Sequence, residues 1–400
     1  MCLLLIVSSC KKDNSSSGSN SPIHYFTEFG SFNVERVRVF SNGTTVMVGE
    51  AHEGAVILAL DYGGKYLWHH MVHGEGSSIY LDVALLNNGN YMAIGYTNAR
   101  DLGANGLGNN PMINSYSPTG SPDIKVMQTS YEVEFTALCQ LSNGSVMVVG
   151  NTRKDHYRSL LVNFDADRNI NWSNEFTIGP WHSKCLEVLE LQDGSCAVLG
   201  YRSYSSLATE VSKYSTYYLK VQSGNGSLLK IVSYLDHKRE ALLSTYLPER
   251  IRALATSDGL CWATTEEEDN MKVGIHWMHV TDQGDVIDQS RIYGLNNSTV
   301  EGLQKLSEGH YLIVGGTTDG DAGSISNAFR SQKYMLWETD LAGNELNHFY
   351  LGDDIQIQTA LGVVKNLKGL NVFGMQEQNV SGLRHPCYFG IDTIGRFVLP

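Results

Sequence analysis

Seven repeats along this chain of 400 residues each contain the same two turns. The first turn closes on glycine and precedes an apolar run; it lies at residues 41–43, 87–89, 142–144, 192–194, 257–259, 307–309 and 367–369. The second has Asp, Ser or Thr three residues before a glycine in six repeats, at Asp61, Ser117, Ser223, Thr281, Asp340 and Asp392. In the third repeat Arg168 replaces the glycine after Asp165. Because these residues favour tight β-turns, each repeat is predicted to hold four short strands joined by two hairpins and a longer link.

The spacing and composition of these strands predict the fold class. Repeats of about 46 to 65 residues with four strands are typical of propeller blades, so we expect an all-β, seven-bladed β-propeller. In the third repeat, residues 146–149 are apolar throughout, as in an interior strand, whereas residues 171–176 mix polar and aromatic side chains, as at an outer edge.

The second strand ends in glycine in six repeats, and Thr265 holds the equivalent place in the other. These glycines are Gly49, Gly95, Gly150, Gly200, Gly315 and Gly374. We interpret them as a response to crowding between converging strands, since no helix pattern follows them to form a phosphate site.

The repeats also predict how the ring closes. The seventh repeat ends at Pro400 with too little chain for a fourth strand, whereas residues 23–29 resemble the fourth strands elsewhere. We expect this N-terminal strand to complete the last blade and leave no unpaired edge. Residues 23–400 would form one domain, with blades at 32–75, 76–132, 133–180, 181–236, 237–294, 295–354, and 355–400 together with 23–30.

The N-terminus carries an apolar core from Leu3 to Val7 that is too short to span a bilayer. Residues 7–10, Val-Ser-Ser-Cys, resemble the lipobox of bacterial lipoproteins, in which a peptidase cuts before a cysteine that is then acylated. The resemblance implies a signal peptide at residues 1–9 and a lipid on Cys10. That family has a basic region before the apolar core, but only Met1 and Cys2 stand there here, which predicts a translation start further upstream. An ordinary signal peptide with a chance cysteine is the alternative.

Residues 10–22 form a tether rich in Ser, Gly and Asn, which is expected to be disordered. Together, the lipobox, the tether and the seven repeats resemble the functionally uncharacterised propeller lipoproteins of Bacteroidetes. The resemblance implies a location in the bacterial cell envelope, attached to a membrane only through the lipid and facing the periplasm or the cell surface.

Charge and cysteine content exclude several classes of partner. A net charge of −13 and a pI near 5.4 disfavour nucleic acid, which requires basic surface. The cysteines form neither a disulfide framework nor a zinc pattern, and the two Asp-rich segments that echo calcium loops lack the downstream glutamate. We therefore expect no metal, no cofactor and a monomer. Catalytic signatures such as a nucleophile elbow, a P-loop or His-Glu-x-x-His are missing from the sequence.

Loop lengths indicate which end of the ring carries function. In a propeller the links between first and second strands and between third and fourth open on one face, and here these are the tight turns. The longer links therefore gather on the opposite face, where we expect binding residues. The candidates are Tyr96, Asn98, Arg153, His156, Trp181, Tyr201, Arg202 and Tyr204.

The leading hypothesis is an envelope lipoprotein that binds a glycan, a peptide or a partner protein on this face. One alternative is a polysaccharide lyase or hydrolase with paired carboxylates, or a His/Arg/Tyr group, in a deep central pocket. Another is a structural subunit of an envelope complex, which an exposed apolar patch on the outer wall would support.

Overall fold

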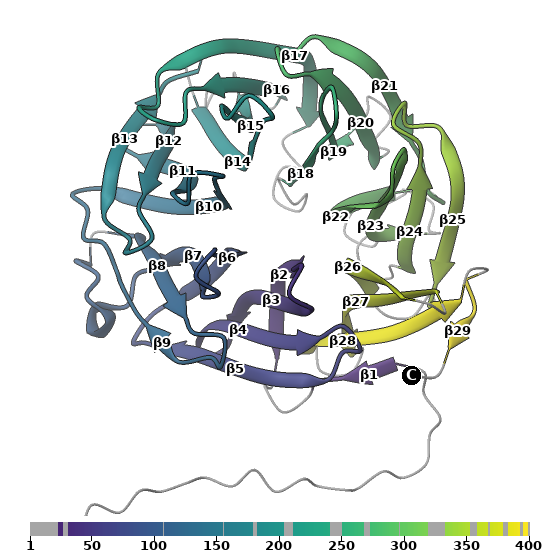
Figure 1. Cartoon of the computed structure of the whole chain (residues 1–400), viewed down its shortest axis with the longest axis horizontal. Helices are drawn as coiled ribbons and strands as arrows, with labels where there is room; N and C mark the ends of the chain where they lie inside the picture. Colours follow the sequence, from purple (N-terminus) through teal and green to yellow (C-terminus); the bar gives the residue numbers. More distant parts are fainter. Residues whose placement is uncertain are drawn as a thin grey trace, which may run out of the picture.

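Seven blades stand in a ring around a central axis (Figure 1) in the computed structural model of the chain. Each blade is an antiparallel sheet, and in six of them the four strands follow one another in sequence order from the centre outward, which confirms the predicted seven-bladed β-propeller. The structure describes residues 23–26, 31–106, 108–154, 156–178, 182–203, 211–240, 250–267, 273–295, 297–318, 333–352, 358–366, 369–378, 383–392 and 395–398.

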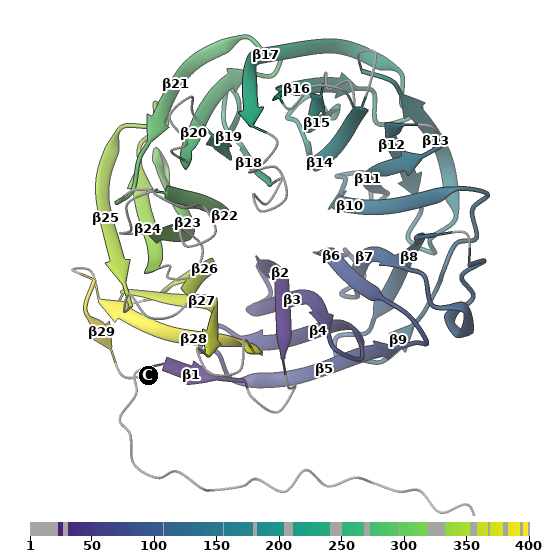
Figure 2. The ribbon, with the colours of Figure 1, turned by 180° about the vertical axis from the view of Figure 1, so that it is seen from behind.

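The inner two strands of each blade lie closest to the axis, as the view from behind also shows (Figure 2). The first strands are β2 (Phe32–Val39), β6 (Ser78–Leu85), β10 (Glu132–Gln140), β14 (His182–Glu190), β18 (Ile251–Ala255), β22 (Asn297–Ser307) and β26 (Gln358–Asn366). The second strands are β3 (Thr44–Ala51), β7 (Tyr91–Thr97), β11 (Val146–Arg153), β15 (Cys196–Ser203), β19 (Gly259–Glu267), β23 (His310–Thr318) and β27 (Gly369–Gln378).

The outer two strands of each blade complete the wall of the ring. The third strands are β4 (Gly54–Asp61), β8 (Asn110–Tyr116), β12 (Tyr157–Phe164), β16 (Val211–Val221), β20 (Val273–Thr281), β24 (Lys333–Thr339) and β28 (Leu383–Asp392). The fourth strands are β5 (Tyr66–His73), β9 (Pro122–Asp123), β13 (Ile170–Phe176), β17 (Leu228–Glu240), β21 (Val286–Ile292) and β25 (Glu345–Leu351). A short 3₁₀ helix, η2 (Arg100–Leu102), lies between β7 and β8.

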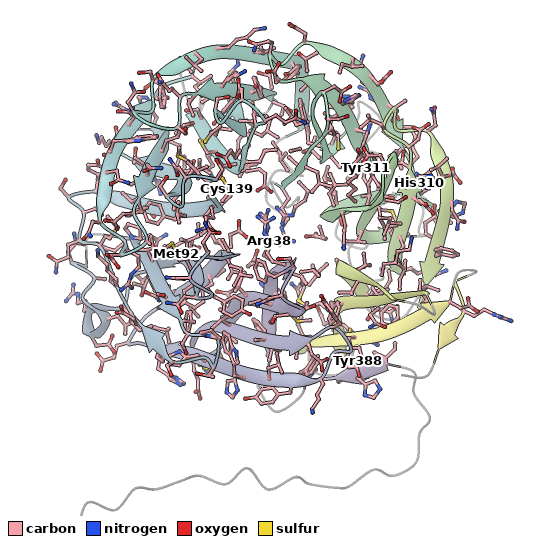
Figure 3. All side chains as sticks on the ribbon, viewed as in Figure 1. Arg38, Met92, Cys139, His310, Tyr311 and Tyr388 are labelled. Atoms are coloured by element: carbon pink, nitrogen blue, oxygen red, sulfur yellow. The ribbon has the colours of Figure 1, made fainter. Side chains whose placement is uncertain are left out.

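The fourth strand of the last blade is assembled from both ends of the chain. β1 (Ile23–Tyr25) pairs antiparallel with β28, placing His24 opposite Tyr388, and the two rings stack 4.8 Å apart. The prediction that the N-terminal strand closes the ring is therefore confirmed. The C-terminal end contributes as well, because β29 (Phe397–Val398) pairs with β28 next to the β1 segment, at Gly390 and Ile391. Tyr388 marks this junction in Figure 3.

Apolar side chains fill the spaces between neighbouring blades. Trp68 of the first blade stacks on Tyr116 of the second, with ring centroids 6.0 Å apart, and its indole N–H donates to the Pro118 carbonyl at 2.9 Å. Trp172 and Trp277 repeat the arrangement, donating to the outer turn of the next blade at Ser223 and Leu341. Each of these blades is thus joined to the next by burial of an aromatic ring together with a satisfied indole.

The glycines that end the second strands have the structural role predicted for them. Each pairs with the residue just before a bulge in the first strand; Gly95, for example, pairs with Tyr80. A Cβ atom on Gly95 would lie 1.9 Å from the Ile79 carbonyl oxygen, so only glycine fits there. In the fifth blade, where Thr265 replaces the glycine, β18 pairs with β19 in unbroken register from Ile251 to Ala255.

Candidate functional site

The two ends of the ring differ in the length and variety of their links. We call the end with the glycine turns the tight-turn face and the opposite end the long-loop face. On the long-loop face the second and third strands are joined by residues 98–109 in the second blade but only by His52 and Glu53 in the first. Because this one link is short while its neighbour is long, the surface is hollowed above the first blade.

A polar pocket of about 610 Å³ occupies this hollow. It lies between the β3–β4 hairpin of the first blade and the segment that leads into the second blade. Its lining residues are Ser31, Asn33, Glu50, Ala51, His52, Gly54, Gly76, Ser77 and Ser78. Burial, and then the nearby charge of Glu35, raise the pKa of Glu50, which favours the protonated carboxyl form of this side chain.

Hydrogen bonds and ion pairs from three blades fix the side chains beside this pocket. Arg384 of the last blade donates to Asn33 Oδ1 at 3.1 Å, and Asn33 in turn donates to Glu35 at 2.9 Å. Glu35 also accepts a hydrogen bond from the guanidinium of Arg250 at 2.9 Å, and Arg250 directly precedes the fifth blade. The pocket is therefore held by a connected network rather than by one loop, which keeps its polar groups in fixed positions.

Two of the candidate residues, Tyr96 and Asn98, lie beside the pocket. Asn98 Oδ1 accepts the Ser77 N–H at 2.8 Å, so this side chain shapes the pocket wall. Tyr96 is half-buried, and burial together with the carboxylates Glu134 and Glu50 raises its pKa, so its hydroxyl stays protonated. Both residues are close enough to influence a bound ligand, although Tyr96 belongs to strand β7 rather than to the link in which it was expected.

The structure brings Arg153 and His156 together with three residues that the sequence analysis did not single out as candidates. The five form what we call the Tyr157 cluster: Arg153, His156, Tyr157, His182 and Lys184. Lys184 Nζ lies 4.5 Å from the centre of the Tyr157 ring, and Arg153 Cζ lies 5.5 Å from it. The rings of His156 and His182 are 6.3 Å apart. Cations stacked on an aromatic ring are stabilised by its negative face.

Tyr201 and Arg202 are half-buried strand residues beside this cluster. Tyr201 pairs with Lys184 across β14 and β15, which places the two side chains on the same side of the sheet. Arg202 Nε donates to Ser215 Oγ at 2.8 Å. The remaining candidates, Cys10, Trp181 and Tyr204, lie outside the described residues.

A buried ion-pair network, missed by the sequence analysis, crosses the centre of the ring. Arg36 of the first blade contacts Glu187 of the fourth, and Arg38 holds Asp82 of the second through two hydrogen bonds of 2.9 and 2.8 Å. Figure 3 shows Arg38 at the centre of the ring. Burial opposes ionisation of Asp82, but Arg36 and Arg38 outweigh it and keep its pKa below the usual value.

The network continues toward the fifth and sixth blades. Arg250 contacts Glu301 as well as Glu35, and Arg252 donates to the Glu301 carbonyl at 2.7 Å. Arg36, Asp82 and Glu187 are at most 5% exposed, so their side chains are packed together at the centre of the ring. The polar pocket lies away from this centre, between the first and second blades. Charged residues in otherwise apolar first strands are the signal that could have revealed this network.

Among the residues that the structure describes, no group of three His, Cys, Asp or Glu side chains is placed to hold a metal ion. No helix within the described segments is long and apolar enough to cross a membrane. Asp165, one of the residues that echo a calcium loop, instead caps its own turn by accepting the N–H groups of Asp167 and Asn169.

No family model matches the chain, and no curated protein matches it. Solved structures similar to it include a protein of unknown function from Bacteroides caccae, with 11% identity, a TM-score of 0.43 and coverage of 77% of this chain and 93% of the other. A protein of unknown function from Dyadobacter fermentans is similar at 11% identity and TM-score 0.43, covering 81% and 97%. An ulvan lyase of a new polysaccharide lyase family is similar at 9% identity and TM-score 0.43, covering 89% and 94%. None of these similarities carries an argument about function.

Proposed function

We propose that the chain is a lipid-anchored protein of the bacterial cell envelope whose long-loop face binds a glycan. The observation that carries the glycan-binding part is the polar pocket between the first and second blades. Its volume of about 610 Å³ suits a small-molecule ligand, and its lining supplies hydroxyl, amide, carboxyl and imidazole groups. These groups match the alternating donors and acceptors of sugar hydroxyls.

The experiment is a glycan array probed with the purified protein, followed by titration calorimetry with each glycan that binds. Asn33→Ala and Glu50→Ala should each weaken binding by about tenfold or more, because each removes a polar partner held in the pocket. The matched control is Asn143→Ala on the tight-turn face, where Asn143 Oδ1 accepts only from Ser145 within its own turn. Equal losses in Asn143→Ala, at unchanged melting temperature, would overturn the assignment of the face.

Glycoside hydrolysis is a second candidate, which the pairing of Glu50 with Glu35 favours. A carboxyl whose pKa is raised beside an ionised carboxylate is the arrangement that glycosidases use for general acid catalysis. If the protein is a hydrolase, a glycan that binds should be cleaved, and new reducing ends should appear. Glu50→Gln would then abolish cleavage while retaining measurable affinity. Binding without release of reducing ends in the wild-type protein would exclude this candidate.

The outer wall of the ring gives less support to the alternative that the protein is a structural subunit of an envelope complex. Its exposed apolar side chains are spread over several blades, on β5, β13, β17, β21 and β25. An interface with a stable partner usually presents a contiguous apolar patch.

Membrane attachment is a separate part of the proposal, and it rests on the Val-Ser-Ser-Cys motif at residues 7–10. Cys10→Ala, expressed from the native start, should move the protein from the membrane fraction to the soluble periplasmic fraction. Unchanged partitioning into detergent would exclude the lipid anchor and leave the binding proposal intact.

A further inference from the structure

The Tyr157 cluster gathers positive charge on a protein whose net charge is −13. It lies on the long-loop face where the third and fourth blades meet, with Arg153 on β11, Tyr157 on β12, and His182 and Lys184 on β14. Arg158 and Arg202 flank it on β12 and β15. Such a concentration of cations within a few ångströms of one ring is unfavourable unless anions offset it.

Two carboxylates hold cations in and beside this cluster. Glu175 accepts a hydrogen bond from Lys154 Nζ at 2.9 Å and another from the Tyr131 hydroxyl at 2.8 Å. Glu132 lies 3.5 Å from Arg153, which is beyond a strong hydrogen bond, and the Arg153 side chain is 57% exposed. Arg153 is therefore loosely held and can turn toward a ligand, whereas Lys154 is committed to Glu175.

His182 is oriented to donate while it is neutral. Its Nδ1 atom lies 3.1 Å from the Tyr157 backbone N–H and accepts that hydrogen bond, so the proton of the neutral ring is on Nε2. Burial, and then the charges of His156 and Lys184, lower the pKa of His182, in agreement with this geometry. The cluster thus offers an imidazole N–H, an ammonium and a guanidinium around one ring.

A series of side chains connects the cluster to the pocket. Ser78 lines the pocket and pairs with Thr97, which is adjacent to Tyr96. Tyr96 interacts electrostatically with Glu134 and Glu132, and Glu132 contacts Arg153. The pocket and the cluster therefore belong to one series of contacts over the first four blades, which suits an extended ligand better than a single sugar.

We propose that the Tyr157 cluster is a second subsite, which binds a carboxylate or sulfate group on the glycan held in the pocket. This inference rests on the proposed function of the long-loop face and names its ligand class as an acidic glycan. Lys184 and Arg153 supply charge-assisted hydrogen bonds to the anion, and His182 supplies a neutral donor.

The test is titration calorimetry with matched pairs of oligosaccharides. One pair is tetragalacturonate and its fully methyl-esterified form, and the other is a sulfated tetrasaccharide and its desulfated form. The member of a pair that carries the bound anion should bind at least about tenfold more tightly than its neutral counterpart, since one charge-assisted hydrogen bond is worth about that factor. The two pairs distinguish a carboxylate from a sulfate ligand.

Variants locate the effect on the surface. Lys184→Gln and Arg153→Gln should each reduce the ratio of the affinities for the charged and neutral members by about tenfold or more. The matched control is Lys305→Gln, an exposed lysine of first strand β22 near the tight-turn face, which pairs with Glu308 at 2.6 Å. Lys305→Gln should behave like the wild type.

The outcomes separate this inference from the proposed function. Tight binding of glycans with equal affinity for charged and neutral members would overturn the second subsite and leave the pocket proposal standing. A preference for charged members that Lys305→Gln weakens as much as Lys184→Gln would also overturn it, because the attraction would then be non-specific. If none of the oligosaccharides binds and the glycan array is blank, the function itself is wrong.

Discussion

The two faces of the ring satisfy their polar side chains in different ways. On the tight-turn face a recurring partner is the turn's own backbone: Asp61 Oδ1, for example, accepts the N–H groups of Gly63 and Lys65 at 2.8 and 2.9 Å. On the long-loop face the side chains beside the pocket have partners from other blades, as in the contact of Arg384 with Asn33. Groups consumed in building a turn are unavailable to a ligand, whereas groups positioned by several blades can face solvent in a fixed arrangement.

At the centre of the ring, between the two faces, the ionic groups are buried and come from segments that are distant in the sequence. Asp82→Asn should give the largest effect, lowering the free energy of unfolding by about 3–5 kcal/mol, since Arg36 and Arg38 would lose a buried counter-charge. Denaturant unfolding monitored by tryptophan fluorescence measures it.

The control for the centre is an exposed ion pair near the tight-turn face. Asp285→Asn removes the partner of Lys230, 3.2 Å away, at a side chain that is 72% exposed. Its cost should be below about 1 kcal/mol, because water screens such pairs. Equal costs for Asp82→Asn and Asp285→Asn would show that the central network contributes no more than a surface pair.

The closure of the ring should give the next largest effect. Phe26 packs in a core formed by the first and last blades and is 7% exposed, while its backbone N–H donates to the Pro386 carbonyl at 3.0 Å. Phe26→Ala should therefore destabilise the protein by about 3 kcal/mol, and deletion of residues 23–29 should in addition expose the edge of β28 and promote aggregation.

Deletion of residues 14–20, which precede the closing strand, is the control and should leave the melting temperature unchanged. Similar melting temperatures for the two deletions would mean that β29 alone is sufficient to close the last blade. Pairing of β28 with one end of the chain would then be sufficient at this edge.

The difference between the faces also explains what could be predicted from the sequence. Turn chemistry is local, so the residues themselves located the hairpins, the four strands of each repeat and the N-terminal closing strand. Arg168, in the place of a glycine, adopts the same left-handed conformation as the glycines at this turn in the other repeats, with φ of 64°. The bulge that explains the second-strand glycines has the same local character, because it recurs at one position in six blades.

The candidate site was predicted less completely because its geometry depends on contacts between distant segments. Loop lengths pointed to the long-loop face, on which Tyr96, Asn98, Arg153 and His156 lie, but they could not show that the short link at His52 would leave a pocket. Nor could the sequence show that Lys184 reaches the Tyr157 ring from the next blade. Arg36 and Glu187 meet although they are 151 positions apart, and only the ring brings them together.

Lowering the pH should change the free energy of unfolding less than the substitutions at the centre and at the closing strand, and it should affect the two faces in different pH ranges. Burial works against ionisation of Asp193 on the tight-turn face, but hydrogen bonds from Lys220 and Ser195 lower its pKa to about 2. Its contribution to stability is therefore present above the unfolded pKa near 3.9 and is lost as the pH falls toward 2. The pKa of His182 on the long-loop face is lowered too, so its contribution is present above its usual value near 6.5 and declines as the pH falls below it.

The two contributions begin to fall at different pH values, near 6.5 for His182 and near 3.9 for Asp193, which makes a direct test possible. Asp193→Asn should lower the free energy of unfolding at pH 7 by less than about 1 kcal/mol, because the side chain is 45% exposed, and the difference from wild type should vanish near pH 2. His182→Gln should leave the acid limb unchanged and flatten the wild-type decline between pH 7 and pH 5. Denaturant unfolding at a series of pH values measures both. A decline between pH 7 and pH 5 that persists in His182→Gln would assign it to another group, and the long-loop face would then lose its distinct response to pH.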